Sequence, residues 1–191
     1  MSIFDKLKSA APGSPGAPSS PAGGGNRSEV FTFPALPESL AQMQALPEAS
    51  LDTPFKTAAL TVCALCAYAA DRNVGTEMLN FLRGPRPLNG FDISFLNDRF
   101  RGGKTYIPFS YFSGATPDNG YTPQPPFRVT VQSNHVSAEE AGYMKLFIPC
   151  FGADSPRPVK LRQRGSDGKW FLWEQYLLTD IRQPKSLDPW A

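Results

Sequence analysis

The sequence is poor in the side chains that most often carry chemistry. It contains one histidine, His135, and three cysteines, Cys63, Cys66 and Cys150. A redox cysteine pair needs the start of a helix and a zinc site needs further ligands at suitable spacing, whereas Cys63 and Cys66 lie in the middle of an apolar run. Acid–base catalysis would fall to carboxylates, and no spacing selects a pair of them. We therefore predict no metal and no cofactor, leave catalytic residues unassigned, and favour a protein that is not an enzyme.

Excess charge of one sign and long hydrophobic runs are also scarce. Lys6, Lys8 and Arg27 outnumber Asp5 by two, which accounts for the entire net charge of +2. The rest of the chain is balanced and lacks a general basic footprint, so we expect no nucleic-acid partner. The longest apolar run, residues 57–70, is shorter than the ~18 residues that a membrane span requires, so we expect no integral membrane segment. Few cysteines, odd in number and without a secretory signal, predict a cytoplasmic protein.

Proline, glycine, alanine and serine dominate the stretch that precedes the first apolar segments. Residues 10–25 form a linker of this composition, which cannot bury enough apolar surface to order itself. The first nine residues would place three apolar side chains on one side of a short helix. They are either a disordered start or a docking peptide on a tether. We predict a disordered tail and linker over residues 1–29 and a single α+β domain over residues 30–191.

The most apolar segment predicts a core helix over residues 54–70. Alanine, leucine and cysteine favour a helix here, Pro54 suits its first turn, and the polar residues 71–73 close it. Because the run leaves almost no polar face for water, the other elements are expected to pack around it. Capping residues and apolar spacing predict three further helices: a short one started by Pro37 and stopped by Pro47, one from Asn73 to about Arg83, and one from Asn89 to about Phe100.

The pattern changes in the second half of the chain to short runs rich in aromatic and β-branched residues. Proline and glycine loops separate these runs, which is typical of β-strands. Helices first and strands second predict an α+β fold, in which N-terminal helices pack on a C-terminal, mainly antiparallel curved sheet. The predicted strands cover residues 106–112, 127–131, 143–150, 158–164 and 169–178.

The last predicted hairpin carries the most informative combination of side chains. Period-two alternation places three cations of its first strand and two large aromatic residues of its second strand on one face: Lys160, Arg162, Arg164, Phe171 and Trp173. Such a face can bind an anionic or aromatic ligand through charge-assisted hydrogen bonds and stacking. Alternatively, the stems of the cations simply cover aromatic rings at the margin of the core. Since both faces carry apolar groups, we expect this hairpin to lie inside the sheet.

Several stretches resemble an uncharacterised family of bacterial domains found largely in Firmicutes. They include GPRPL, SYFSGATP, GADSPRPVKLR and GKWFLWEQ, and the resemblance extends over roughly residues 34–191. The family implies a cytosolic single domain and supplies no catalytic residue, substrate or cofactor. The order of helices and strands is also similar to the α+β roll of nuclear-transport-factor-2-like proteins, a likeness of topology alone.

Two functions are consistent with these features. The sequence favours a non-catalytic binding or protein-interaction domain, with an unknown protein or a small anionic ligand as partner and a homodimer as one arrangement. The alternative is a small roll-type enzyme that uses a pocket carboxylate on an anionic or aromatic small molecule. A carboxylate that faces a tyrosine or arginine inside a closed cavity would favour the enzyme.

Overall fold

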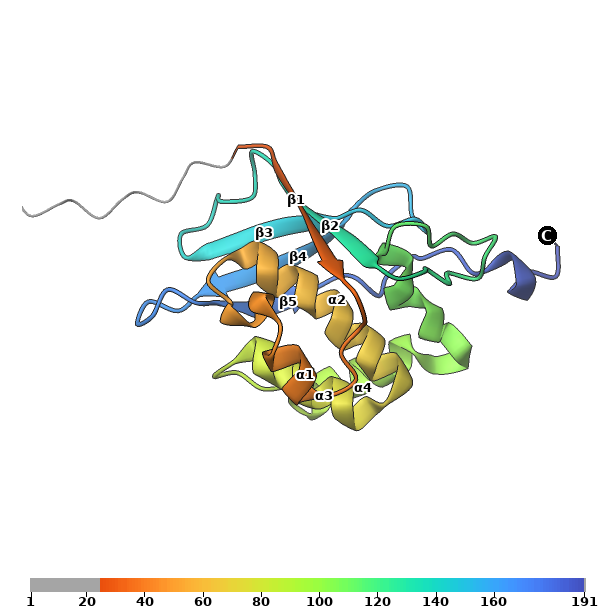
Figure 1. The fold of residues 1–191 in the computed structure, drawn as a ribbon, viewed down its shortest axis with the longest axis horizontal. Coiled ribbons are helices and arrows are strands. Elements are labelled where there is room, and N and C mark those ends of the chain that lie inside the picture. Colours follow the sequence, from red (N-terminus) through yellow and green to blue (C-terminus); the bar gives the residue numbers. More distant parts are fainter. Residues whose placement is uncertain (1–24, 191) are drawn as a thin grey trace, which may run out of the picture.

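A five-stranded antiparallel sheet with a helical layer against one face makes up the fold of residues 25–190, the part of the chain that the computed structural model describes (Figure 1). The strands are paired in chain order from β1 to β5, and the sheet is not closed into a barrel. Its strands are β1 (Arg27–Phe33), β2 (Phe127–Ser133), β3 (Tyr143–Ile148), β4 (Arg157–Gln163) and β5 (Trp170–Gln175). The helices are α1 (Leu40–Gln44), α2 (Pro54–Ala70), α3 (Arg72–Arg83) and α4 (Gly90–Arg99), with the shorter 3-10 turns η1 (Pro47–Ser50), η2 (Arg101–Tyr111) and η3 (Lys185–Leu187).

The predicted core helix is confirmed as α2, and it contacts every strand of the sheet. Thr53 caps its start by accepting a hydrogen bond from the Lys56 amide at 3.3 Å, and nearly all of its residues are buried. Asp71 ends α2 and also caps α3, because its carboxylate accepts the amides of the second and third residues after it. The predicted cap of the third helix, Asn73, therefore lies inside α3.

Two strands differ from the sequence prediction. β1 was not predicted; it pairs with β2 along its whole length and begins at Arg27, within the stretch predicted to be a disordered tail. Residues 1–24 of that tail, including the nine-residue start, lie outside the described residues. The predicted strand over residues 106–112 is wrong, since η2 occupies this segment and only Phe112 makes a single bridge, to Val129. Pro108 has no amide to donate to a ladder, and two left-handed glycines at the start of η2 turn the chain.

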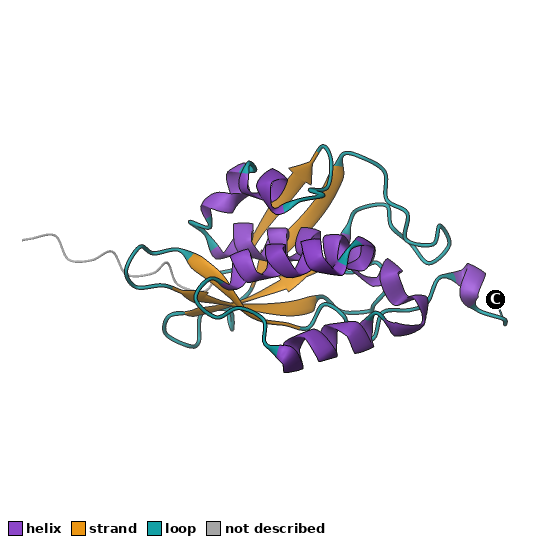
Figure 2. Cartoon of the chain, turned by 90° about the horizontal axis from the view of Figure 1, so that it is seen from below, coloured by secondary structure: helices purple, strands orange, loops and turns teal. Residues whose placement is uncertain are grey.

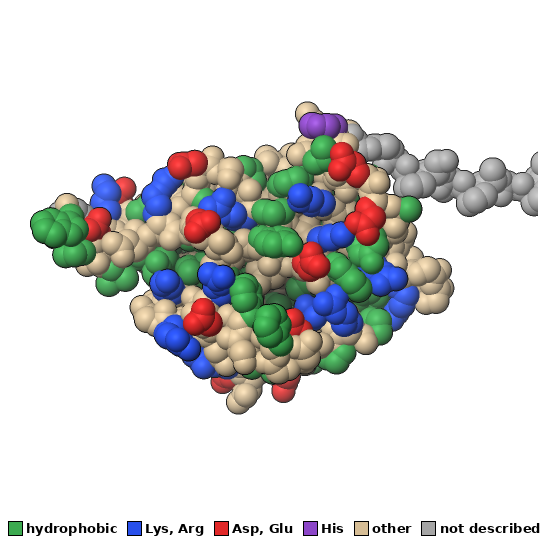
Figure 3. All heavy atoms as spheres, turned by 180° about the vertical axis from the view of Figure 1, so that it is seen from behind, with side chains coloured by type: hydrophobic (Ala, Val, Ile, Leu, Met, Phe, Trp, Pro, Cys, Tyr) green, Lys and Arg blue, Asp and Glu red, His purple; other side chains and the backbone are tan. Residues whose placement is uncertain are grey.

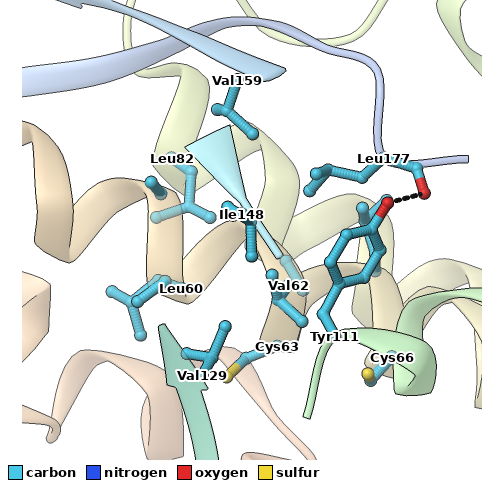
Figure 4. Close-up of a cluster of buried hydrophobic side chains, with 14 of the residues drawn as sticks. Leu60, Val62, Cys63, Cys66, Leu82, Tyr111, Val129, Ile148, Val159 and Leu177 are labelled. Atoms are coloured by element: carbon cyan, nitrogen blue, oxygen red, sulfur yellow. Dashed lines mark hydrogen bonds between the residues drawn. The ribbon is translucent and has the colours of Figure 1, made fainter. Parts of the chain in front are cut away.

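The core lies between α2 and the inner face of the sheet (Figure 4). Strand residues that alternate toward α2 are fully buried, and they include Val129, Ile148 and Val159. Tyr111 reaches this layer from η2 and donates its hydroxyl to the carbonyl oxygen of Leu177 at 2.6 Å. This hydrogen bond satisfies the polar end of a ring that is otherwise surrounded by apolar groups.

The α+β class and the antiparallel sheet are confirmed. Figure 2 shows the helices gathered over one side of the strands, and the opposite face of β3, β4 and β5 carries charged and aromatic side chains. β5 is the last strand in the order, so the expectation that the final hairpin lies inside the sheet is wrong. The likeness to the roll of nuclear-transport-factor-2-like proteins stays a prediction.

Candidate functional site

The predicted basic and aromatic residues do share the outer face of the β4–β5 hairpin. Arg162 is paired with Phe171, while the neighbouring pair Leu161 and Leu172 is buried against the helices. A register shift between Lys160 and Leu161 leaves Trp173 as the extra residue on β5. We call the five residues of the prediction the basic–aromatic face: Lys160, Arg162, Arg164, Phe171 and Trp173.

Each cation of the basic–aromatic face lies over an aromatic ring. The Arg162 Cζ atom is 4.8 Å from the centre of the Trp173 ring, and the Arg164 Cζ atom is 4.6 Å from that of Phe171. Lys160 lies over Tyr143 of β3, with its Nζ atom 4.4 Å from the ring centre. These contacts are typical of cation–π interactions and also of charged stems that cover apolar surface. The stacking of cations on aromatic rings therefore does not by itself distinguish a ligand-binding face from one on which charged side chains merely cover the core.

A further arginine, Arg86, was missed by sequence reasoning. It comes from the loop between α3 and α4, and its Cζ atom lies 4.2 Å from the centre of the Trp173 ring. Trp173 is therefore contacted by two guanidinium groups from separate parts of the chain. The available signal was the GPRPL stretch, residues 84–88, which contains Arg86 and is one of the stretches that carry the family resemblance.

The α3–α4 loop is held in place by buried polar contacts. Arg83, at the end of α3, donates to the carbonyl oxygen of Arg86 at 3.0 Å and to the carboxylate of Asp92 at 3.2 Å. Burial lowers the pKa of the Arg83 guanidinium and the Asp92 charge opposes this change. Asn80 accepts the amide of Leu88 at 2.8 Å. These bonds fix the backbone from which Arg86 extends toward Trp173.

The four outer cations differ in whether a carboxylate already neutralises them. Lys160 binds Glu140 at 2.6 Å, a hydrogen bond that raises the pKa of the lysine. Arg164 forms a two-pronged ion pair with Asp167, and its hydrogen bonds lower the pKa of that carboxylate to about 2. By contrast, the side chains of Arg86 and Arg162 form no salt bridge or hydrogen bond with any residue between 25 and 190, which leaves both guanidinium groups available to an anion.

Two hollows adjoin Trp173. Figure 3 shows a depression on the rear face of the molecule, with basic, acidic and hydrophobic side chains around it. The outer groove, of about 440 Å³, is lined by residues of the basic–aromatic face and of the α3–α4 loop. The inner hollow, of about 170 Å³, lies between β5, α3 and α4. The two share four lining residues: Arg83, Arg86, Leu172 and Trp173.

Asp92 and Glu174 are the carboxylates of the inner hollow, and the first of them faces an arginine. Asp92 accepts the Asn89 amide at 3.1 Å in a capping box at the start of α4 and also binds Arg83. The Oδ2 atom of Asp92 therefore holds both the start of α4 and the α3–α4 loop, so this carboxylate has a structural role. Glu174 accepts the hydroxyl of Tyr176 at 3.1 Å. Because the hollow is open to solvent, neither contact meets the closed-cavity condition that would favour the enzyme.

The remaining residues weighed from the sequence show ordinary structural surroundings. Cys63 and Cys66 are buried in α2, and burial raises the pKa of both thiols. His135 is exposed in the turn after β2. Within residues 25–190, no group of three or more His, Cys, Asp or Glu residues is arranged to hold a metal ion. No helix of that same range has the length and apolar character needed to cross a membrane.

The fold and the surface together define an α+β domain with a basic and aromatic outer sheet face. The chain belongs to the family described as a domain of unknown function (DUF6935), whose model matches residues 35–185. This confirms the resemblance to an uncharacterised domain family, while its bacterial distribution and its sequence signature stay predictions. No curated protein and no solved structure matches the chain.

Proposed function

We propose that this domain is a non-catalytic binding module that holds a small anionic ligand on the basic–aromatic face. The observation that supports it is the arrangement at Trp173, where the guanidinium groups of Arg86 and Arg162 lie over one indole ring and neither has a carboxylate partner among the described residues. Guanidinium groups bind carboxylates and phosphates through paired, charge-assisted hydrogen bonds. An anion at this position gains two such groups without breaking an existing ion pair.

The geometry around Trp173 limits how far apart the two cations lie. The two Cζ atoms lie 4.2 and 4.8 Å from the same ring centre, so at most about 9 Å separates them, and both side chains line the outer groove. The ring is also contacted edge-on by Tyr143, with 5.5 Å between ring centres. A side chain packed from several directions keeps its orientation and presents the arginines in a preformed arrangement.

Titration with inorganic phosphate tests the proposal. We expect saturable binding by calorimetry, together with a shift of the Trp173 indole N–H resonance, assigned with the Trp173→Phe variant. Arg162→Gln removes one charged donor set and is expected to weaken binding by ~1.5–3 kcal/mol, or roughly 10- to 150-fold. Arg128→Gln is the matched control, because Arg128 is an exposed arginine on β2 that forms no ion pair and no contact with Trp173 within residues 25–190.

Two results would contradict the proposal. If phosphate, acetate and other small anions all fail to bind at millimolar concentration, the proposal is overturned and the protein-interaction alternative is favoured. Equal weakening by Arg162→Gln and Arg128→Gln would show that the anions respond only to overall charge. Thermal melts of both variants establish that they are folded under the conditions of the titration.

A further inference from the structure

The outer groove and the inner hollow meet at β5. Arg86 and Trp173 belong to both, and so do the buried residues Arg83 and Leu172. Leu172 points toward the helices and Trp173 points toward the outer face. The residues that the two spaces share therefore lie on both sides of β5. A ligand held on Arg86 thus has a second space within reach, beneath the α3–α4 loop.

The inner hollow is mainly apolar in its lining. Leucine and phenylalanine side chains from α2, α3, α4, β5 and the α3–α4 loop surround it: Leu65, Leu79, Leu88, Phe95, Leu96 and Leu172. Its volume of about 170 Å³ is similar to the roughly 150 Å³ of enclosed apolar cavities that accept a benzene molecule, although this hollow is open to solvent on one side. A single six-membered ring or a branched alkyl group of similar size fits this space.

The charged groups around the two spaces determine where the anionic group of a ligand can lie. Arg83 is paired with Asp92 inside the hollow, and Glu174 is a further carboxylate on its wall. Arg86 and Arg162, which have no carboxylate partner within residues 25–190, lie at Trp173. An anion deep in the hollow would meet carboxylates, whereas an anion at the shared wall meets arginines. The apolar part of a ligand therefore enters the hollow and its charged part stays outside.

We infer that the ligand is a small amphipathic anion, with a carboxylate or phosphate on Arg86 and Arg162 and one ring-sized apolar group in the inner hollow. This inference rests on the proposed function, because it needs the two arginines to bind an anion. It adds to the anionic group of that ligand an apolar group of about the size of one ring. Aryl carboxylates such as benzoate and phenylacetate are the simplest members of the class.

Three probes separate the contributions of the two spaces in the wild-type protein. Acetate carries the anionic group alone, benzyl alcohol carries the ring alone, and benzoate carries both. We expect calorimetry or NMR titration to show benzoate binding at least tenfold more tightly than either of the others. Nuclear Overhauser contacts are expected between the benzoate ring protons and the methyl groups of Leu88 and Leu96.

A variant that fills the inner hollow with a larger side chain tests the contribution of this space to binding. Leu88 is half-buried on its wall, so Leu88→Trp is expected to remove the tenfold advantage of benzoate while acetate and phosphate bind as before. Leu187→Trp, at an exposed leucine of η3, is the control and is expected to leave every affinity unchanged. Arg86→Gln is expected to weaken benzoate and acetate alike.

The outcomes distinguish this inference from the proposed function. If acetate and phosphate bind but benzoate gains nothing and shows no contact to Leu88 or Leu96, the ligand class is wrong and the anion site remains. If no anion binds, the proposed function is wrong and the inference is lost with it. The wild-type probe series decides between these results even if Leu88→Trp is too unstable to study.

Discussion

At the scale of single residues, neighbouring side chains of one chemical type have different partners. Arg162 and Arg164 are two positions apart at the end of β4, yet Arg164 is neutralised by Asp167, whereas Arg162 has no carboxylate partner within residues 25–190. An existing ion pair must be broken before its cation can serve a ligand, so the unpaired arginine is the stronger candidate. The partner of each cation therefore determines its function more than its position on the face does.

Removal of the Trp173 side chain is expected to lower the free energy of unfolding more than removal of the Arg162 side chain. Trp173 is half-buried beneath cations, so Trp173→Ala should lower the free energy of unfolding by about 2 kcal/mol, less than the ~3–5 kcal/mol of a fully buried aromatic residue. Arg162→Ala removes an exposed group and should change it by less than ~0.5 kcal/mol. Urea denaturation measures both values. A large loss in Arg162→Ala would instead assign the arginine to covering the core.

The cysteines of α2 are expected to behave as small apolar residues. Burial raises the thiol pKa of Cys63 and Cys66, so both remain protonated and inaccessible in the folded protein at pH 8. Alkylation followed by mass spectrometry should therefore label Cys150, which is half-buried, well before the other two. Adding denaturant should make all three react. Rapid native labelling of Cys63 or Cys66 would show that α2 opens locally.

At the scale of elements, the α3–α4 loop connects the helical layer to the outer sheet face. Gly84 begins the loop with φ 58° and ψ −119°, and it packs directly against the ring of Phe171. A Cβ atom at this position would lie 2.4 Å from Cδ1 of that ring. The loop therefore approaches β5 closely only because residue 84 has no side chain.

Gly84→Ala is expected to destabilise the domain by at least ~1–3 kcal/mol, from backbone strain at positive φ and from displacement of Phe171. The same change should weaken anion binding, since the backbone that carries Arg86 must move. Gly90→Ala is the control, because it lies in the first turn of α4 with nothing near its side-chain position and should be neutral or slightly stabilising. Equal melting temperatures for the two variants would contradict this account of the loop.

Asp71 is expected to support two helices at once. Its backbone ends α2, and its carboxylate accepts the amides of Asn73 and Val74 at 2.8 and 3.2 Å. Asp71→Ala should cost ~0.5–2 kcal/mol in thermal denaturation, as for other helix caps. Asp71→Asn keeps an acceptor oxygen and should recover most of that loss. A similar loss in both variants would mean that charge rather than capping is responsible.

At the scale of the whole molecule, β1 extends the folded unit beyond the segment that matches the family. The match begins at residue 35, whereas β1 pairs with β2 and buries Phe31 and Phe33 in the core. Two buried phenylalanines and a complete ladder are too large a contribution to lose from a domain of this size. The strand next to the N-terminal linker is therefore an integral part of the sheet.

Truncations on either side of β1 test this conclusion. A protein that starts at residue 25 is expected to keep the melting temperature of the full chain, because a linker rich in proline, glycine, alanine and serine offers little apolar surface to bury. A protein that starts at residue 35 loses Phe31 and Phe33 and should melt at least 10 °C lower or fail to fold. Circular dichroism measures both. Identical melts would show that β1 is dispensable.

Periodicity and capping residues in the sequence determined the local elements. The uninterrupted apolar run specified α2, Asn89 specified the start of α4, and alternation placed Arg162 and Trp173 on one face of their hairpin. These features depend on neighbours a few residues apart, so they are readable before the chain is folded. β1 was missed although Phe31 and Phe33 alternate, because the segment directly follows a linker.

Only the tertiary structure decided which of the predicted site residues are available and what surrounds them. The pairing of Lys160 with Glu140 spans twenty residues, and the contact of Arg86 with Trp173 joins a helical loop to a strand far along the chain. No local pattern encodes such pairs, because they depend on how the loop is folded against the edge of the sheet. The hollow beside Trp173 likewise exists only where α3, α4 and β5 meet, since its walls come from elements that are separate in sequence.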